Sequence, residues 1–144
     1  EALSEVRTAV VGMRGASLAF EIDKARQALT AADIQAEISA LTTDGFPAQE
    51  AVLAMALREG VTNVIRHAGA KRCDIRLEPS AKALTLTIAD DGSGAGRLVE
   101  GSGLKGMRAR LAAIGGALDI RSGKTGTRLV ATAPLSSANG ETAS

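Results

Sequence analysis

The order of helical and strand-like segments predicts a single α+β domain, with helices layered on one face of a mixed β-sheet. Apolar residues recur at helical spacing in some segments and alternate with polar residues in others. Along the chain the order is helix, helix, strand, helix, strand, strand, helix, strand, strand. The strands come in hairpins rather than in regular βαβ units, and 144 residues suit one domain.

The first third of the chain predicts two helices and a strand. Residues 2–14 have one apolar stripe at helical spacing, formed by Leu3, Val6, Val10 and Met13. After Gly15, Ser17 can cap a second helix. The stripe of this helix is formed by Leu18, Ile22, Ala25 and Leu29. Residues 34–41 alternate apolar and polar side chains and are expected to form a strand.

The longest helix is expected at residues 48–68. Pro47 suits its first turn, and Gly69 is its expected stop. Five apolar residues should share its buried face at 100° per residue: Leu57, Val61, Val64, Ile65 and Ala68.

The last part of the chain predicts two hairpins separated by a helix. Residues 73–79 and 84–90 alternate as strands around PSAK, and a glycine-rich loop fills 90–103. The next helix has an apolar face formed by Leu104, Met107, Leu111 and Ile114, and Gly115-Gly116 ends it. Two strands, ALDIRS and TRLVATAP, follow around a GKTG turn. The tail, 136–144, is small and polar and is expected to be disordered.

Composition excludes several function classes. The net charge of +1 gives no bulk attraction to nucleic acid or to an anionic membrane. With two Phe and no Trp or Tyr, the chain lacks platforms for stacking bases. Cys73 is the single cysteine, so an internal disulfide or a thiolate metal site is excluded. No apolar run approaches the ~18 residues of a membrane span, and a reducing cytoplasmic setting fits best.

Residues 101–106, GSGLKG, match the G-x-G-x-x-G pattern of dinucleotide-binding domains. That pattern should follow a strand directly and be followed by an acidic residue about 20 positions on. Here it follows RLVE within a loop, and the segments after its helix form a hairpin and not a further βαβ unit. The glycines instead open a helix, whose N-terminal amides attract phosphate, and Lys105 can reach the same anion. The alternative is that they only relieve turn strain.

The helix at 57–70 has a polar face formed by Glu59, Asn63, Arg66 and His67. Glu59, Asn63 and His67 are spaced i, i+4, i+8 and should stack along one line. Mg²⁺ prefers oxygen ligands, of which Asn63 can supply one, while Glu59 can hold a coordinated water. The alternatives are a solvated polar face and, for His67, a hydrogen-bonded helix end.

The stretch ADDGSGAG places a carboxylate, Asp90, at the end of a strand, with Gly92 and Gly94 allowing a sharp turn. Such a carboxylate can accept a hydrogen bond from the exocyclic amine of adenine. The alternative is an ordinary Asp-Gly turn.

Taken in order, these segments resemble the ATP-binding domain of sensor histidine kinases. REGVTNVIRHAGA resembles the asparagine box, DDGSG the first glycine box, GSGLKGM the second, and GTRLVATAPL the terminal strand that closes the adenine pocket. The fold is shared with the gyrase, Hsp90 and MutL (GHKL) ATPases, a two-layer α/β sandwich of the Bergerat type. The likeness is strongest to the DesK/NarX-type subfamily and covers about residues 18 to 135.

The resemblance implies a role for each matching residue. Asn63 would bind the Mg²⁺ that bridges the phosphates, Glu59 would lie beside that metal, and Glu59 and His67 would be catalytic. A mobile lid would cover the phosphates at 95–102. ATP binding would fall to Asn63, Arg66, His67, Asp90, Gly92, Gly94, Gly101, Gly103, Leu104, Lys105, Gly106 and Thr127.

The resemblance also implies partners. Residues 1–16 would be the end of the second helix of a dimerising hairpin, 17–135 the catalytic domain, and 136–144 a tail. The only histidine is His67, so the phosphoacceptor would lie on a hairpin that this chain lacks, in the same or a partner protomer. The full-length protein would be a homodimer that phosphorylates a response regulator. Since Glu1 is not a natural start, we expect a fragment, the intracellular domain of a membrane-anchored kinase.

Two other functions fit the same fold. An anti-sigma-factor kinase would phosphorylate a serine on a partner, although such proteins lack a preceding hairpin helix and the GLKGMRARL run. A non-catalytic module would use ATP only to order the lid and set partner contacts. Phosphotransfer to a hairpin supplied in trans would distinguish these functions.

Overall fold

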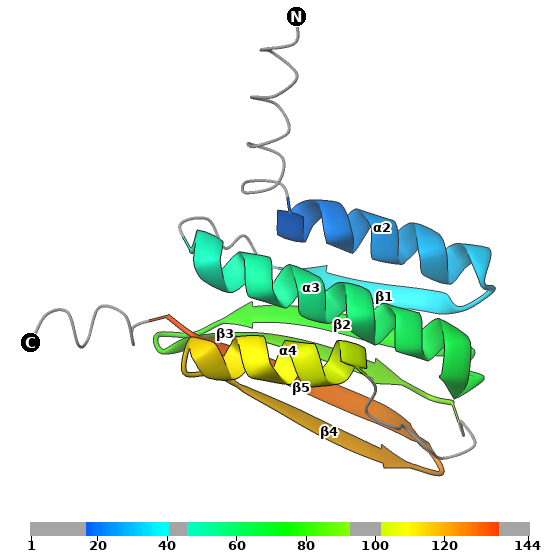
Figure 1. Cartoon of the computed structure of the whole chain (residues 1–144). Coiled ribbons are helices and arrows are strands. Elements are labelled where there is room, and N and C mark those ends of the chain that lie inside the picture. The colour runs from blue at the N-terminus through cyan, green and yellow to red at the C-terminus, as the bar shows by residue number, and fades with distance from the viewer. Residues whose placement is uncertain (1–16, 41–45, 93–101, 136–144) are drawn as a thin grey trace, which may run out of the picture.

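In the part of the chain that the structure describes, three α-helices cover one face of a five-stranded sheet (Figure 1). The computed structural model describes residues 17–40, 46–92 and 102–135. The expected helix at 2–14, the C-terminal tail and residues 95–101 of the expected lid lie outside these residues, whereas Ser102, the last residue of the expected lid, is the first residue of the helix Ser102–Ala113. The elements are α2 (Ser17–Ala31), β1 (Gln35–Ala40), α3 (Pro47–Asn63), the π-helical turn η1 (Val64–Ala68), β2 (Arg72–Pro79), β3 (Ala83–Asp90), α4 (Ser102–Ala113), β4 (Ala117–Gly123) and β5 (Gly126–Pro134).

The sheet is mixed. Its strand order is β1-β2-β3-β5-β4, with β1 parallel to β2 and every other neighbouring pair antiparallel. The β2–β3 and β4–β5 hairpins form where the sequence predicted them. In the first turn Ser80 N–H donates to Ala83 O at 2.8 Å. The predicted α+β class, with helices on one face of a mixed sheet, is therefore confirmed.

The core lies between the sheet and the helices. Alternate residues of β3, Leu84, Leu86 and Ile88, are buried, as the period of two requires. Most residues of the helical stripes predicted for α2 and α4 are buried as well, with Ile22 and Ile114 partly buried. Burial of both helical stripes against one sheet face explains why α2 and α4 lie in the same layer.

The long helix differs from the prediction at its C-terminal end. It is α-helical to Asn63 and then widens into the π-turn η1, which Gly69 ends with a left-handed φ of 63°. The expected apolar face was wrong at Ile65, which is 37% exposed. Because a π-turn has i→i+5 hydrogen bonds, projection at α-helical spacing no longer holds beyond Asn63.

One buried charge was not predicted. Glu21 of α2 is 7% exposed, and its carboxylate accepts a hydrogen bond from Arg58 of α3 at 3.1 Å. The Arg58 side chain is itself largely exposed, so the ion pair joins the two helices at the edge of the core. Without Arg58 the buried Glu21 carboxylate would have no charged partner among the apolar side chains around it, which would be costly.

Close approach of α3 to the sheet positions the site. A Cβ on Gly60 would lie 2.5 Å from Cδ1 of Ile88, so glycine allows the helix to sit directly on β3. Asn63 follows one turn later and Asp90 lies two residues beyond Ile88. The C-terminal end of α3 is thereby held over the C-terminal end of β3.

Within the described residues, no helix is long and apolar enough to cross a membrane.

Candidate functional site

The polar face of α3 carries Glu59 and Asn63, both partly buried. The Nδ2 atom of Asn63 is buried and has no hydrogen-bond partner among the described residues. Buried amides are normally paired, so an orphaned one marks a position where a ligand would complete the hydrogen bonding. Rotation about χ2 exchanges the positions of the amide O and N atoms, so either can be turned toward a ligand. The donor set therefore fits a metal–phosphate group.

The next turn is the π-helical segment η1, which carries Arg66 and His67. Arg66 is exposed, and the side chain of His67 lies outside the described part of the structure. Single π-turns within helices occur frequently at functional sites. The expected line of Glu59, Asn63 and His67 assumed an unbroken α-helix. Because the π-turn begins directly after Asn63, His67 does not follow it at α-helical spacing.

Asp90 ends β3 on the helix-covered face of the sheet. Thr127 of β5 lies directly opposite, and Cys73 of β2 lies opposite on the other side. The carboxylate Oδ1 accepts a hydrogen bond from Gly92 N–H at 2.8 Å, and Thr127 N–H also donates to the carboxylate. Burial raises the pKa of Asp90 despite these two hydrogen bonds. The structure thus places Thr127, which the resemblance assigns to ATP binding, beside Asp90.

The Cys73 thiol is fully buried beside this carboxylate. Burial raises its pKa to about 12, with a further contribution from the negative charge of Asp90. It therefore stays a neutral thiol and acts as a small apolar side chain beside Asp90.

Gly126 allows β5 to pass against the end of β3. Its φ is +145°, and a Cβ at this position would overlap the backbone carbonyl oxygen of Asp90. A residue with a side chain at position 126 would push Asp90 away from Thr127. Glycine is therefore needed before Thr127 for Asp90 and Thr127 to lie side by side.

The N-terminus of α4 lies against α3. A Cβ on Gly103 would overlap the carboxylate of Glu59, so these residues, from the second glycine box and the asparagine box, are in direct contact. Leu104 is buried, Lys105 is exposed and Gly106 is partly buried. Of the other predicted glycines, Gly92 is buried at the end of β3, whereas Gly94 and Gly101 lie outside the described residues.

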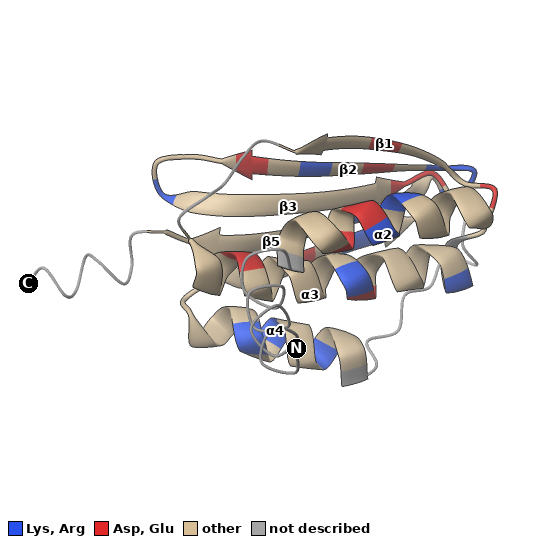
Figure 2. Cartoon of the chain, turned by 90° about the horizontal axis from the view of Figure 1, so that it is seen from above, with Lys and Arg blue, Asp and Glu red and all other residues tan. Residues whose placement is uncertain are grey.

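Charge on α4 favours an anion at its N-terminus. The helix carries Lys105, Arg108 and Arg110 and no acidic residue, as Figure 2 shows. Its first-turn amides add a partial positive charge. Phosphate groups are the anions that such a helix end commonly binds.

Replacing Gly103 with alanine is expected to weaken Mg·ATP binding about tenfold without unfolding the domain. The new Cβ would displace the Glu59 carboxylate, a flexible side chain that can move at little cost in stability. Titration calorimetry would measure the affinity. Urea unfolding of both proteins would measure the stability, which should stay within about 1 kcal/mol of wild type. Unchanged affinity in Gly103→Ala would contradict a role for the Glu59–Gly103 contact.

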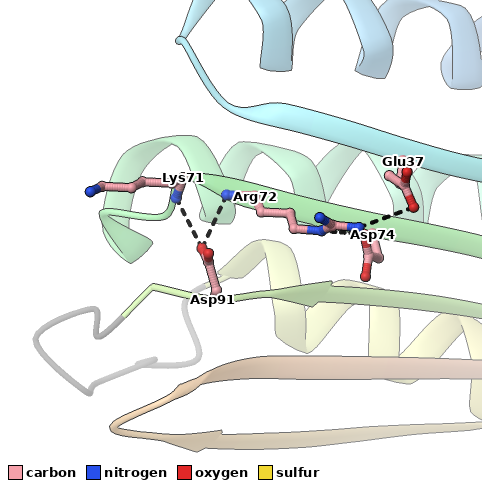
Figure 3. A network of polar contacts seen from close by, with 5 residues as sticks. All are labelled: Glu37, Lys71, Arg72, Asp74 and Asp91. Carbon is pink, nitrogen blue, oxygen red and sulfur yellow. Dashed lines mark hydrogen bonds and ion pairs between the residues drawn. The ribbon is translucent and has the colours of Figure 1, made fainter.

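Asp91 is a residue that the sequence analysis missed. Its Oδ1 accepts hydrogen bonds from the N–H groups of Lys71 and Arg72 at 2.9 and 3.0 Å (Figure 3). Its own N–H donates to Arg72 O at 3.2 Å. These bonds lower the pKa of Asp91. They tie the loop after η1 to the end of β3, so the asparagine box and the first glycine box are fixed to each other. The only sign of this role in the sequence is that DDG contains a second aspartate, which follows Asp90 directly.

The side chain of Arg72, whose N–H bonds Asp91, makes two further ion pairs. Its guanidinium contacts Glu37 Oε1 at 3.1 Å and Asp74 Oδ1 at 3.3 Å (Figure 3). These pairs are exposed and contribute little to stability.

Replacing Asp91 with alanine should lower the melting temperature at pH 7 by roughly a few degrees. Because the folded-state pKa lies below the ordinary 3.8, the stabilisation is fully present above pH 3.8 and is lost as the pH falls through the folded value. Thermal melts by circular dichroism from pH 2 to 7 would measure it. A difference between wild type and variant that does not shrink in acid would contradict the charge-assisted role.

Comparison with known proteins identifies the family. Residues 48–137 match the histidine kinase-, DNA gyrase B- and HSP90-like ATPases. The chain belongs to this family, an ATP-binding domain of the GHKL type.

Among the relatives are two sensor histidine kinases of Bacillus subtilis. The chain is 36% identical to DesK over 143 residues, covering 94% of this chain and 38% of DesK. It is 34% identical to YvfT over 139 residues, covering 93% of this chain and 37% of YvfT. The chain thus spans less than two fifths of the length of either relative.

A solved structure has the same fold. The histidine kinase domain of the blue-light activated kinase from Erythrobacter litoralis aligns with a TM-score of 0.71 at 21% identity, covering 83% of this chain and 61% of that one. The predicted Bergerat-type fold is thereby confirmed.

Proposed function

We propose that this domain binds Mg·ATP and donates the γ-phosphoryl group to a histidine on a dimerisation hairpin, for relay to a response regulator. The observation that carries the proposal is the contact of the Glu59 carboxylate with Gly103. It supports a shared phosphate site of the asparagine box and the second glycine box, at the N-terminal end of a basic helix.

Adenine recognition would fall to Asp90. Its carboxylate is partly buried at a strand end, where it would accept a hydrogen bond from the exocyclic amine. Thr127 lies directly opposite and adds a hydroxyl, while Gly92 is buried beside them. An acceptor held in a partly dry site discriminates well, because an unmatched base would leave it unpaired.

The phosphates and the metal would lie between α3 and α4. The fit rests on the orphaned amide of Asn63 and the neighbouring carboxylate of Glu59, both able to supply oxygen to Mg²⁺ directly or through water. When bound, Mg²⁺ neutralises charge on the phosphate oxygens. Lys105 and the amides of α4 would add further positive potential, and Arg66 and His67 would lie near the phosphates.

Phosphoryl transfer asks little covalent chemistry of this domain, since positioning and charge neutralisation provide most of the rate. The chain's residues would hold the nucleotide, and the hairpin would supply the nucleophile and its base. We therefore propose that residues 1–16 continue into that hairpin, that the whole protein is dimeric, and that it consumes cytoplasmic ATP as the intracellular part of an anchored kinase.

Calorimetric titration with ATP, ADP and GTP, each with and without Mg²⁺, tests the binding step. It suits a chain without Trp or Tyr, which has almost no intrinsic fluorescence. Adenine-selective binding strengthened by Mg²⁺ is expected. A radiolabelled γ-phosphate should then appear on an isolated hairpin added in trans. Binding without transfer to any hairpin would instead favour the non-catalytic module, and transfer to a partner's serine would favour the serine kinase.

A further inference from the structure

We infer that Ser122, on the edge strand β4, sets the hydrogen-bonding direction of the Thr127 hydroxyl and is a positioning residue for the choice of adenine over guanine. The inference rests on the proposed nucleotide site and extends it to a residue outside the family's boxes.

The first step is placement. Ser122 lies directly opposite Thr127 in the β4–β5 register, and Thr127 lies opposite Asp90 in the β3–β5 register. On β4 the buried Leu118 and the partly buried Ile120 face the helices, so Ser122 faces the same way. The three polar side chains thus form one cross-strand row on the helix-covered face of the sheet.

The second step is contact. The Oγ atom of Ser122 lies 2.9 Å from Oγ1 of Thr127, and either hydroxyl could be the donor. Directly opposed side chains in an antiparallel pair are close enough to interact. The backbone N–H of Thr127 is meanwhile committed to the Asp90 carboxylate. Only the Thr127 hydroxyl is left to adapt to a ligand.

The third step counts donors and acceptors. A hydroxyl has one proton to donate and two lone pairs, whereas an ionised carboxylate only accepts. If Ser122 donates to Thr127, the Thr127 proton stays free for an acceptor on the base. Asp90 and Thr127 then present an acceptor beside a donor.

That pattern matches one purine. Adenine presents an amine donor beside a ring-nitrogen acceptor, while guanine presents a carbonyl acceptor beside a ring N–H donor. Guanine would therefore oppose Asp90 with an acceptor and Thr127 with a donor. Ser122 strengthens the discrimination by holding the Thr127 proton in the direction that suits adenine.

The test compares dissociation constants for Mg·ATP and Mg·GTP by calorimetry in wild type, Ser122→Ala, Ser122→Thr and Thr127→Val. Ser122→Ala should lower the ATP-over-GTP ratio by about tenfold, with most of the change in ATP affinity. Ser122→Thr keeps the hydroxyl and should restore the ratio. Since the two hydroxyls act as one unit, Ser122→Ala in a Thr127→Val background should lower it no further.

The control is Ser39→Ala on β1, the edge strand at the other side of the sheet. Ser39 and Ser122 are both exposed serines on edge strands. It should leave the ratio unchanged. A wild-type ratio in Ser122→Ala, or an equal loss of ATP and GTP, would overturn the inference and leave the proposed function intact. Wild-type protein that binds ATP and GTP alike would overturn the adenine site and this inference together.

Discussion

Replacing Asp90 with asparagine is expected to abolish the preference for adenine nucleotides and to raise the stability of the ligand-free domain at neutral pH. Asparagine keeps an oxygen that can accept from the N–H groups of Gly92 and Thr127. It removes the charge, so the hydrogen bond offered to the adenine amine weakens. Selectivity for ATP over GTP should fall by about a hundredfold or more.

The gain in stability follows from the direction of the pKa shift. Burial raises the pKa of Asp90 above its ordinary 3.8, so the folded state binds the proton more tightly than the unfolded chain does. Stability therefore falls as the pH rises from 3.8 through the folded-state pKa, and the cost is fully present above it. The asparagine side chain of the variant does not titrate, so the cost disappears.

Melting curves of both proteins from pH 3 to 8, recorded by circular dichroism, would measure this effect. The advantage of Asp90→Asn should be greatest near neutral pH and should vanish below pH 3.8. Wild-type selectivity for ATP in the variant would rule out an adenine contact at this residue. A variant that is less stable at pH 7 would show that the lost charge-assisted hydrogen bonds outweigh the desolvation of the carboxylate.

The sheet and the helical stripes were predictable because each depends on local periodicity. The alternation along β3 indicates both the strand and its buried face, and Gly69 and Gly115 mark helix ends where φ is positive. The juxtaposition of Asp90 and Thr127 needed the resemblance to a known family. Spacing along the chain does not reveal which strands pair.

What the sequence did not reveal depends on contacts between distant segments. The π-turn after Asn63 leaves no signature in a projection made at α-helical spacing. The Asp91 bonds to Lys71 and Arg72 and the Glu21–Arg58 pair join residues that come together only through β-sheet pairing or helix packing. Ser122 and Thr127 are only five residues apart across a predicted turn, but their contact depends on the exact strand register. Hydrophobic periodicity predicts which residues are buried, but it does not predict which polar side chains contact each other.

Two site residues share one energetic property. Asp90 is a carboxylate whose burial raises its pKa, and Asn63 has a buried amide nitrogen without a partner among the described residues. Each costs stability in the ligand-free domain, and in each a nucleotide or its metal would supply the missing interaction. By contrast Asp91, whose hydrogen bonds lower its pKa, stabilises the fold. The direction of this energetic effect thus distinguishes the two proposed binding residues from Asp91, whose contacts stabilise the fold.

Replacing Asn63 with alanine is expected to lower the affinity for Mg·ATP by about a hundredfold while leaving the ligand-free domain as stable as wild type or more so. The substitution removes an unsatisfied buried amide, a group that costs about 1–3 kcal/mol, and alanine favours the helix. Affinity for ATP without Mg²⁺ should change much less, because the amide is proposed to act through the metal.

The matched control is Thr62→Ala on the same turn of α3, where the hydroxyl donates to Arg58 O at 2.8 Å. It should bind Mg·ATP like wild type. Calorimetry with and without Mg²⁺, together with urea unfolding, gives both quantities for each variant. Equal affinity losses with and without Mg²⁺ in Asn63→Ala would place the amide on the nucleotide rather than on the metal. Unchanged Mg·ATP binding would remove Asn63 from the site, and a large loss of stability would mean that the amide has a structural partner in solution.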